Sequence, residues 1–371
     1  MRFWIRGRKR PRTRLFATAR ARNLVLDLRA SSAIMPHIKA LAAHSAGAPL
    51  EAYEFEMPEL GAEEVEIAVE YCGICHSDLS MWKNDWGMTS YPFVPGHEII
   101  GTVTKLGSAA KKLQVGDRVG VGWISGSCMA CRECLSGRQN LCPNQEGSIV
   151  GRPGGFAQTT RAHWAWAIPL PEELDPALFG PMFCGGITVF QPIVLGNVKP
   201  TDRVAVIGIG GLGHMALMFL KSWGCEVTAF TSSDSKIEEA KRLGAHKTLN
   251  TRDEAAIKGA AGSFDFVLST VNVSLDWPAI LGTLAQGGRL HFVGAALEPA
   301  PIPAFALISG EKSVAGSPTG PPQTTATMLD FCARHGIAPV VEEFPMSQAN
   351  EALKHLEDGK ARYRIVLKQD L

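Results

Sequence analysis

The sequence lacks a long uninterrupted apolar run. Its most apolar segment, residues 204–220, carries the glycine-rich stretch GIGGLGH, and no window of about eighteen apolar residues is free of charge or of a glycine cluster. Such a chain has no ordinary membrane-spanning helix, so we expect a soluble protein without a membrane partner. With 371 residues, 46% of them hydrophobic, the chain can form two domains that each bury a core.

Acidic side chains are almost missing from the N-terminal end. Residues 1–34 hold nine Arg and one Lys but a single Asp, although the whole chain has a net charge of only +1. This composition fits a mitochondrial-type transit peptide, sequence translated upstream of a true start at Met35, or a basic arm that binds nucleic acid. We favour the start at Met35 and expect residues 1–34 to lie outside the fold. No basic patch occurs beyond them, so we expect no nucleic-acid partner.

The sequence also lacks the even cysteine set and the secretory signal of a disulfide-bonded secreted protein. It has nine cysteines, and four of them lie within SCMACRECLSGRQNLC. An odd, clustered set favours metal-bound thiolates in a reducing interior. We therefore expect a cytoplasmic protein, or a mitochondrial one if residues 1–34 are a genuine transit peptide.

Two patterns divide the rest of the chain. Residues 38–183 contain short apolar segments broken by glycine, such as VEIAVEY and GDRVGVGW, which indicate a β-rich domain. From about Gly185, strand-like segments alternate with helical ones, beginning with RVAVIGI and GLGHMALMFLKSWG. This alternation predicts an α/β doubly wound fold, a parallel sheet with helices on both faces. Two helical stretches and the apolar strand YRIVLK close the chain and could return to the first domain.

A glycine motif marks a dinucleotide site. VAVIGIGGLGH is a strand that leads into Gly208, Gly210 and Gly213 and then into a helix. In the GxGxxG pattern the first glycine makes a tight turn, the second lets a pyrophosphate approach the backbone, and the third lets helix and strand pack closely. The strand–glycine–helix context favours dinucleotide binding over a glycine-rich turn without a ligand.

The end of the next strand indicates which dinucleotide is bound. An NAD site places an acidic residue there to bind the ribose 2′-hydroxyl, whereas an NADP site accepts a 2′-phosphate. Here the strand EVTAF ends in Thr231, Ser232 and Ser233, and Lys236 follows three residues later. Hydroxyls and a cation suit a phosphate, and Asp234 lies beyond the expected position of the acid, so we predict NADP(H). The alternative is a polar turn that caps the next helix.

Four cysteines are close enough in sequence to form one metal site. Their spacing, C-x2-C-x2-C-x7-C, can fold four thiolates into a tetrahedron around one Zn²⁺. Four thiolates leave no position for a substrate, so this metal would be structural and would link metal binding to folding. An iron–sulfur cluster is the alternative. The cysteines of this four-cysteine lobe are Cys128, Cys131, Cys134 and Cys142.

A catalytic zinc needs three protein ligands and an open fourth position. The remaining candidates are scattered along the chain: Cys75 or His76, His97 in VPGHE, and Cys184 in FCGG. Spacing alone does not bring them together, and a single His or Cys is more often a packing residue than a ligand.

Taken together, the motifs resemble those of a known family, the zinc-dependent medium-chain alcohol dehydrogenases. The order and spacing typical of that family are shared by YCGICHSD, PFVPGHEIIG, GDRVGVG, the four-cysteine lobe, FCGGIT, VIGIGGLGH and YRIV. The resemblance covers residues 35–371 and is closest to the NADP-linked, cinnamyl alcohol dehydrogenase-like branch of alcohol dehydrogenases and aldehyde reductases. It implies a GroES-like catalytic domain at 35–185, completed by 319–371, and a Rossmann cofactor domain at 186–318.

The resemblance implies a catalytic zinc bound by Cys75, His97 and Cys184, in addition to the structural zinc, so we expect two Zn²⁺ per chain. A site with two Cys and one His keeps a fourth position open. Asp78 would support the His97 ring, and Glu98 would lie close enough to the metal to assist ligand exchange.

The resemblance also implies the reaction. Zn²⁺ would polarise the oxygen of an alcohol or aldehyde, hydride would pass between the substrate carbon and NADP(H), and Ser77 would carry the proton of that oxygen. Many relatives have histidine at the outer end of this proton relay, where the present chain has Ser80. Because serine is not a base near neutral pH, we expect a weaker pH dependence of alcohol oxidation than a histidine relay would give.

Further cofactor contacts follow from the resemblance alone. His76 matches a position beside the pyrophosphate, and Thr188 matches a position beneath the nicotinamide. The remaining positions expected to bind the cofactor are Gly211, Leu212, Val293, Gly294, Ser317 and Arg364.

Three tryptophans lie in segments that approach the substrate pocket in this family. Trp82 and Trp86 follow the turn of the first ligand, and Trp123 follows GDRVGVG. They would favour aromatic or medium aliphatic aldehydes, although packing in the domain core explains them equally well.

We expect an oxidoreductase that reduces aldehydes and also oxidises primary alcohols, working as a homodimer or homotetramer. One alternative is a polyol dehydrogenase, which should prefer NAD and carry an acidic residue after the second strand of the cofactor domain. The other is a non-catalytic dinucleotide-binding redox sensor, against which the presence of Cys75, His97 and Cys184 argues.

Overall fold

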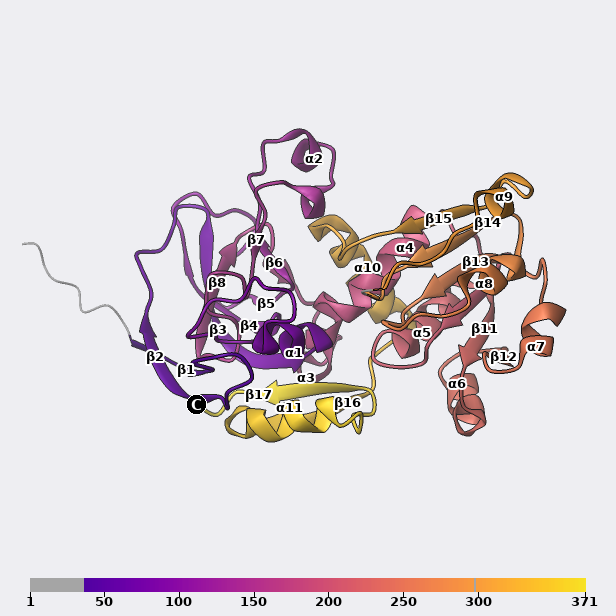
Figure 1. Ribbon diagram of the computed structural model, residues 1–371. Coiled ribbons are helices and arrows are strands. Elements are labelled where there is room, and N and C mark those ends of the chain that lie inside the picture. The colour runs from indigo at the N-terminus through magenta and orange to yellow at the C-terminus, as the bar shows by residue number, and fades with distance from the viewer. Residues whose placement is uncertain (1–36, 297) are drawn as a thin grey trace, which may run out of the picture. The chain divides into compact units, whose positions relative to one another are not determined.

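Two large β-sheets organise the protein (Figure 1). The structure, a computed structural model, describes residues 37–296 and 298–371, all within one unit that spans 36–371. The expectations for residues 1–34 and for a start at Met35 lie outside the described residues. Because the parallel sheet and the β-rich sheet are both present, the predicted fold class is confirmed.

The seven-stranded sheet is mostly antiparallel. Val65, Ile67 and Val69 alternate along its longest strand and are buried, which is the pattern of a strand with one face on a core. The last strand of the chain pairs with this longest strand, so the C-terminus returns to the first sheet. The path is β16 (Val341–Pro345), β17 (Arg364–Lys368), β3 (Glu64–Ile74), β4 (Glu98–Leu106), β5 (Arg118–Val121) and β9 (Ile168–Pro169), with β8 (Thr159–His163) paired to β3.

The six-stranded sheet is parallel throughout. Its first strand in the chain lies in the middle of the sheet, so the chain builds outward from there in both directions, and all carboxyl ends lie at one edge. The order is β12 (Lys247–Asn250), β11 (Glu226–Thr231), β10 (Arg203–Ile207), β13 (Phe264–Ser269), β14 (Leu284–Phe292) and β15 (Ser313–Gly316). Two smaller sheets pair β1 (His37–Ala42) with β2 (Glu51–Glu56), and β6 (Ile124–Gly126) with β7 (Glu146–Gly147).

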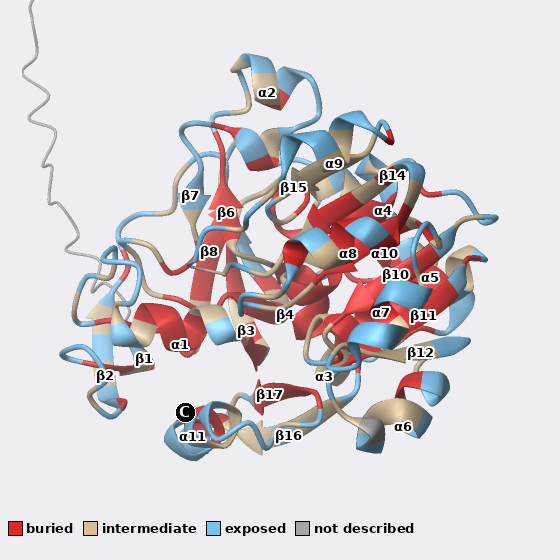
Figure 2. Cartoon of the chain, turned by 45° about the vertical axis from the view of Figure 1, so that its right-hand side comes forward, coloured by how far each residue is buried: buried red, intermediate tan, exposed pale blue. Residues whose placement is uncertain are grey.

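Helices surround these sheets, and the most buried of them is α4 (Gly185–Leu195), which is largely red in Figure 2. It packs in a hydrophobic core with Phe219 of α5 (Gly213–Trp223) and Met328 of α10 (Pro322–His335). The other α-helices are α1 (His76–Lys83), α2 (Arg132–Leu135), α3 (Pro176–Phe179), α6 (Ile237–Arg242), α7 (Glu254–Gly259), α8 (Trp277–Thr283), α9 (Ala304–Ile308) and α11 (Ala349–Glu357). The 3₁₀ helices are η1 (Gln139–Leu141), η2 (Gly180–Phe183), η3 (Asp234–Lys236) and η4 (Met346–Gln348).

One junction differs from the sequence-based expectation. The segment SLDWPAILGTLAQGG predicts a helix that continues to Gly288, but α8 ends at Thr283 and β14 begins at Leu284. Leu284 pairs with Phe264, and the register then shifts along the strand. Gly287, with φ of 72°, absorbs the irregularity because glycine tolerates positive φ.

A helix that spans a membrane must be both long and apolar. Within 37–296 and 298–371, no single helix meets both requirements. The bent pair formed by 176–183 and 185–195 meets them together, by length and composition only.

Candidate active site

Cys75, His97 and Cys184, from separate segments, meet in one cluster of candidate metal ligands, the metal cluster. Cys75 lies between β3 and α1, His97 directly precedes β4, and Cys184 lies between η2 and α4. His97 Nε2 is 3.2 Å from Cys184 Sγ, and the ligand atoms of these three residues and Glu98 all lie within 4.8 Å of one another. Two thiols and an imidazole in this arrangement form a donor set that suits Zn²⁺, for which tetrahedral S···N separations are about 3.5 Å.

Asp78 holds the cluster from behind. Its Oδ1 lies 3.0 Å from His97 Nδ1 and accepts from the backbone N–H of Gly96 at 2.9 Å, while its Oδ2 accepts from the N–H of Cys75 at 2.9 Å. Burial acts to lower the pKa of His97, but the Asp78 carboxylate outweighs it and raises that pKa. Since Nδ1 bonds to Asp78, Nε2 is the nitrogen left for a metal.

Glu98 and Arg364 form a buried ion pair beside the cluster. Arg364 Nη2 donates to Glu98 Oε1 and, at 3.3 Å, to the carbonyl of Ile74, and Arg364 Nη1 lies 4.0 Å from Cys75 Sγ. Glu98 Oε2 is buried and has no hydrogen-bond partner in the described part of the chain. Burial raises the pKa of Glu98 to about 7, against the effect of Arg364. An orphaned carboxylate oxygen at this position fits a nearby metal cation.

The two thiols of the cluster differ in acidity. A hydrogen bond from the Cys184 thiol, with help from Arg364, lowers the pKa of Cys75 well below its usual value. The same bond and burial raise the pKa of Cys184. One thiolate is therefore favoured before any metal binds, and a metal ion would remove the second proton.

The four-cysteine lobe has the geometry of a closed metal site. Three Sγ–Sγ separations are 3.5 Å (Cys128–Cys142), 3.8 Å (Cys131–Cys142) and 3.9 Å (Cys128–Cys134), and all four sulfurs lie within 4.8 Å of one another. A tetrahedral Zn–S₄ site requires about 3.8 Å. Backbone N–H groups, that of Ala130 first, lower the pKa of Cys128 to about 6, whereas burial raises that of Cys134 to about 12.

The glycine loop joins β10 to α5. Gly208 has φ of 88°, which favours glycine, and a Cβ on Gly213 would lie only 1.8 Å from the carbonyl oxygen of Gly208. A Cβ on Gly210 would meet no atom within 4 Å, so space for a ligand lies over this residue. Thr270 at the end of β13 fixes the loop by donating to the carbonyls of Ile207 and Gly208, at 2.9 Å each.

The residues expected at the 2′-phosphate lie at the end of β11 and just beyond it. Ser233 N–H donates to Thr231 Oγ1 at 3.2 Å, and Ser232 is exposed. Lys236 Nζ lies 3.4 Å from the carbonyl of Ile209, so this cation reaches back to the glycine loop. The hydroxyl-bearing turn follows the carboxyl end of β11, and the ammonium group lies near the loop that follows the carboxyl end of β10. Both therefore lie at the same edge of the parallel sheet.

The other expected cofactor residues lie around the glycine loop and the metal cluster. His76 is exposed at the start of α1, and Leu212 precedes α5. A Cβ on Gly211 would lie 3.2 Å from Arg364 Cδ, so Arg364 lies between the loop and Glu98. Thr188 lies on the first turn of α4, where its N–H donates to the carbonyl of Cys184.

Three more residues expected to bind the cofactor follow β14 and β15, at the far end of the carboxyl edge of the parallel sheet. Val293 N–H donates to the carbonyl of Ser269, Gly294 lies against Val271, and Ser317 Oγ is 2.9 Å from His291 Nε2.

The two relay positions differ in exposure. Ser77 is half-buried, and its Oγ lies 3.9 Å from Cys75 Sγ, next to the cluster. Ser80 is buried within α1, so water does not reach it freely. Its effect on the pH dependence stays a prediction.

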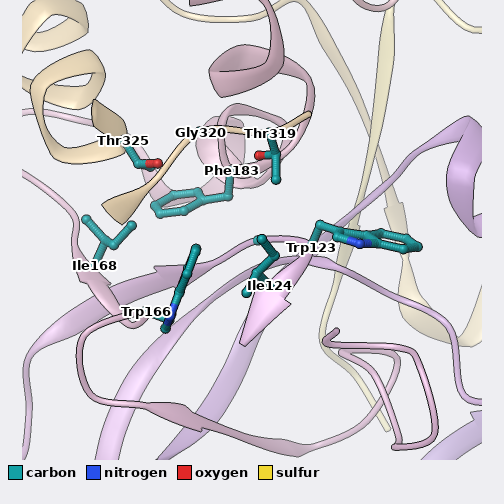
Figure 3. Close-up of a pocket in the computed structure, with 9 residues that line it drawn as sticks. Trp123, Ile124, Trp166, Ile168, Phe183, Thr319, Gly320 and Thr325 are labelled. Atoms are coloured by element: carbon teal, nitrogen blue, oxygen red, sulfur yellow. The ribbon is translucent and has the colours of Figure 1, made fainter. Parts of the chain in front are cut away.

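Aromatic side chains border the metal cluster and a nearby pocket. Trp123 packs edge-on against His97 with ring centroids 5.1 Å apart, and Trp86 packs against Trp123 at 5.9 Å. Trp82 instead donates to the carbonyl of Ala48 at 2.6 Å and packs against the core of the β-rich half. This contact agrees with the alternative that the tryptophan packs in the domain core. In Figure 3, the ring of Trp123 points away from Trp166 and Phe183, which line a pocket on its other side.

Sequence reasoning missed most of that pocket. Trp166 fixes one wall because its Nε1 donates to Ser127 Oγ at 3.0 Å, next to the four-cysteine lobe. The only signal in the sequence was the aromatic stretch HWAWAIP, which carries no spacing that indicates a pocket. Besides Trp123, the lining residues are Gly122, Ile124, Trp166, Ile168, Phe183, Thr319, Gly320 and Thr325.

Comparisons with known proteins agree with this geometry. The family model of the alcohol dehydrogenase GroES-like domain matches residues 61–172, and that of the zinc-binding dehydrogenase matches residues 211–334. The chain is 55% identical over 330 residues to the aldehyde reductase AdhA of Synechocystis sp., which covers 89% of this chain and 98% of the relative.

Solved structures are similar over the same part of the chain. A cinnamyl alcohol dehydrogenase from Sorghum bicolor (SbCAD4) superposes with a TM-score of 0.85 at 36% identity, covering 90% of this chain and 98% of that one. The CAD from Helicobacter pylori, solved in complex with NADP(H), has a TM-score of 0.82 at 29% identity and covers 90% and 99%.

A doubly wound parallel sheet, a β-rich GroES-like half and two cysteine-rich clusters define a zinc-binding dehydrogenase. The chain belongs to the zinc-dependent medium-chain alcohol dehydrogenase family, in its cinnamyl alcohol dehydrogenase-like branch. The predicted class of activity, alcohol dehydrogenase and aldehyde reductase, is therefore confirmed.

Proposed function

We propose that the protein is a zinc enzyme that uses NADP(H) to reduce aromatic or medium aliphatic aldehydes and to oxidise the corresponding primary alcohols. The observation that carries the proposal is the meeting of Cys75, His97 and Cys184 close to the glycine loop. A Cβ on Gly185, the residue after the last ligand, would lie 3.4 Å from both Leu212 and Arg364, so the metal cluster adjoins the start of α5.

The side chains around the cluster have separate tasks in this reaction. Cys75, His97 and Cys184 would hold a Zn²⁺, which would supply a Lewis acid for the oxygen of the substrate. Asp78 would keep His97 oriented through the contact with Nδ1, and Ser77, whose Oγ is 3.9 Å from Cys75 Sγ, would exchange the proton of that oxygen. Trp123 covers one side of His97 and limits the access of water.

The remaining assignments follow the same logic. The four-cysteine lobe would hold a second, structural Zn²⁺, because its four thiols close the coordination shell. Residues 35–185 with 319–371 would form the catalytic domain, and 186–318 the cofactor domain. A homodimer or homotetramer and a cytoplasmic location remain predictions from the sequence.

The cofactor preference is tested by kinetics with NADPH and NADH. Ser232, Ser233 and Lys236 offer two hydroxyls and a cation to a 2′-phosphate, so we expect a higher kcat/KM with NADPH. Replacing Lys236 with Ala should lower kcat/KM for NADPH about tenfold, the effect of a charge-assisted hydrogen bond, and leave that for NADH nearly unchanged. The matched control is Lys258→Ala, since Lys258 is an exposed lysine on α7. A wild-type preference for NADH would refute the assignment and favour the polyol dehydrogenase.

The non-catalytic alternative is tested by metal analysis. Two Zn²⁺ per chain, together with turnover of an aldehyde such as cinnamaldehyde, support the enzyme. One Zn²⁺ per chain without turnover would support a dinucleotide-binding sensor in which only the four-cysteine lobe is loaded.

A further inference from the structure

Residues 317–320 lead from the end of β15, at the cofactor edge of the parallel sheet, toward α10, and contact α4, the helix that follows Cys184. The segment begins just beyond β15, which ends at Gly316. At its other end, a Cβ on Gly320 would lie 2.7 Å from Ile187 of α4. A dinucleotide that lies across this edge with its adenosine at β11 places its nicotinamide half on the side of β13, β14 and β15. The segment therefore borders the nicotinamide end of the site.

His291 holds the beginning of this segment. It lies on β14 and is 2% exposed, its Nε2 is 2.9 Å from Ser317 Oγ, and its Nδ1 has no hydrogen-bond partner within 37–296 and 298–371. Burial lowers the pKa of His291 to about 4, so the ring is neutral near pH 7 and carries one N–H. A proton on Nδ1 would be a buried donor without an acceptor, so it belongs on Nε2. His291 then donates to Ser317 and leaves the Ser317 hydroxyl proton free for another acceptor.

Asn140 holds the end of the segment from a different part of the protein. It lies in η1 of the four-cysteine lobe, two residues before Cys142, and is buried. Its Nδ2 donates to the carbonyl oxygen of Thr319 at 2.8 Å, across 179 positions of the sequence. Thr319 and Gly320 also line the pocket that Trp166 borders (Figure 3). The bond therefore ties the lobe to a wall of this pocket.

We propose that His291 and Asn140 are positioning residues that fix the segment 317–320 at its two ends, so that Ser317 meets the nicotinamide end of the cofactor and Thr319 meets the substrate. The identity of those two ligands rests on the proposed function, whereas the two hydrogen bonds do not. On this proposal the four-cysteine lobe shapes the substrate pocket as well as stabilising its own fold.

The His291 bond is tested by measuring the dissociation constant of NADPH through fluorescence quenching. His291→Leu removes the donor and should weaken binding about fivefold, which corresponds to one buried hydrogen bond. His291→Gln can place an amide N–H near the position of Nε2 and should restore binding to within about twofold of wild type. If the histidine acts through Ser317, the double variant His291→Leu/Ser317→Ala should bind NADPH no more weakly than Ser317→Ala alone.

Two results would overturn the role of His291. One is equal weakening by Leu and Gln, which would mean that ring volume matters rather than the N–H. The other is additive weakening in the double variant, which would mean that His291 and Ser317 act independently. The thermal midpoint of each variant is measured as well, because it shows whether weaker binding comes with a loss of stability. A loss of stability alone would not be reversed by Gln.

The Asn140 bond is tested by kinetics with an aldehyde. Asn140→Ala and Asn140→Asp both remove the donor to Thr319 and should raise the KM of the aldehyde about fivefold, with zinc content equal to that of wild type. The matched control is Asn144→Ala, since Asn144 is an exposed residue of the same lobe and should leave KM unchanged. An unchanged KM in both Asn140 variants, or an equal rise in the control, would overturn the role of Asn140.

Failure of the proposed function can be told apart from failure of this inference. If NADH proves to be the cofactor, the same titrations with NADH test His291 equally well. If no aldehyde is turned over, the binding experiments still decide whether His291 acts through Ser317.

Discussion

Cys184 owes its position to a close approach between two backbone segments. The residue lies between η2 and α4, with φ of −124° and ψ of −76°, outside the helical values. At the start of η2, a Cβ on Gly180 would lie 2.7 Å from the carbonyl oxygen of Glu98. Only glycine allows η2 to lie so near β4, and β4 begins directly after His97. The contact at Gly180 thus brings Cys184 within 3.2 Å of His97.

Replacing Cys184 with Ala should remove the metal of the cluster and most of the activity. A site with only two ligands binds zinc poorly, and loss of the Lewis acid should lower kcat/KM by about a thousandfold or more. The measurements are aldehyde reduction with NADPH and zinc content, which we expect to fall by one ion per chain. The control is Cys225→Ala, a buried thiol outside both clusters, which should keep both values. Full activity in the Cys184 variant would remove this residue from the site.

Single residues were predicted from the sequence to different degrees. The expected metal ligands belong to short motifs with a recognisable order, so Cys75, His97 and Cys184 could be proposed without a structure and the structure brings them together. Asn140 lies in the four-cysteine stretch but is none of its cysteines, His291 belongs to no motif, and their partners Thr319 and Ser317 lie 179 and 26 positions away in the sequence. Such contacts depend on how the sheets and the lobe pack, which periodicity and spacing do not report.

At the scale of elements, a buried ion pair joins neighbouring strands of the seven-stranded sheet. Glu66 on β3 accepts from Arg161 on β8, with Nε at 3.1 Å and Nη2 at 2.7 Å, and pairs with Lys105 on β4 at 2.8 Å. Burial acts to raise the pKa of Glu66, but Lys105 and Arg161 outweigh it and lower that pKa. Because the folded pKa lies below the unfolded one, the carboxylate stabilises the fold above about pH 4.5, and this contribution is lost as pH falls further.

Glu66→Gln should therefore cost stability at neutral pH and less in acid. The amide keeps the shape but loses the charge opposite the buried Arg161, so the free energy of unfolding should fall by about 1–3 kcal/mol at pH 7. The difference from wild type should shrink as the pH is lowered below about 4.5, because the carboxylate is protonated first in the unfolded chain and, at lower pH, in the folded protein as well. Urea midpoints at several pH values measure this difference.

Glu254→Gln serves as the control for the Glu66 variant. Glu254 is an exposed residue of α7, 3.6 Å from Lys258, and exposed pairs of this kind contribute little. A Glu66→Gln deficit that is equal at pH 7 and in acid would show that the charge of Glu66 is not the source of its effect.

At the scale of the whole molecule, the sequence predicted the two kinds of sheet because strand-and-helix alternation is a local signal. The return of the C-terminal strand to the first sheet was only an allowed possibility, since YRIVLK contains nothing that selects β3 as its partner. Short elements such as β12, α7 and α9 were not anticipated, because four to six residues carry too little periodicity. The pairing of β17 with β3 has a functional consequence, as it carries Arg364 to the metal cluster.

Arg364 should couple cofactor binding at the parallel sheet to the stability of the seven-stranded half. It belongs to β17 of the seven-stranded sheet, yet its Cδ and Nη1 lie 3.2 Å from where a Cβ on Gly211 would be. A ligand at 100 times its dissociation constant stabilises the folded state by about 2.7 kcal/mol. For domains of this size that corresponds to a rise of the thermal midpoint of roughly 5 °C with NADP⁺.

Arg364→Gln should lose more than half of that rise at the same NADP⁺ concentration, because the cofactor then makes fewer contacts with the seven-stranded half. The comparison uses the shift between midpoints with and without NADP⁺, so a lower baseline stability of the variant does not decide it. Arg203→Gln is the control, since Arg203 is an exposed arginine of β10 that pairs with Asp265 at 2.9 Å and should keep the full shift. A full shift in Arg364→Gln would mean that the cofactor is held by the parallel sheet alone, and that the strand returning to β3 serves the metal cluster only.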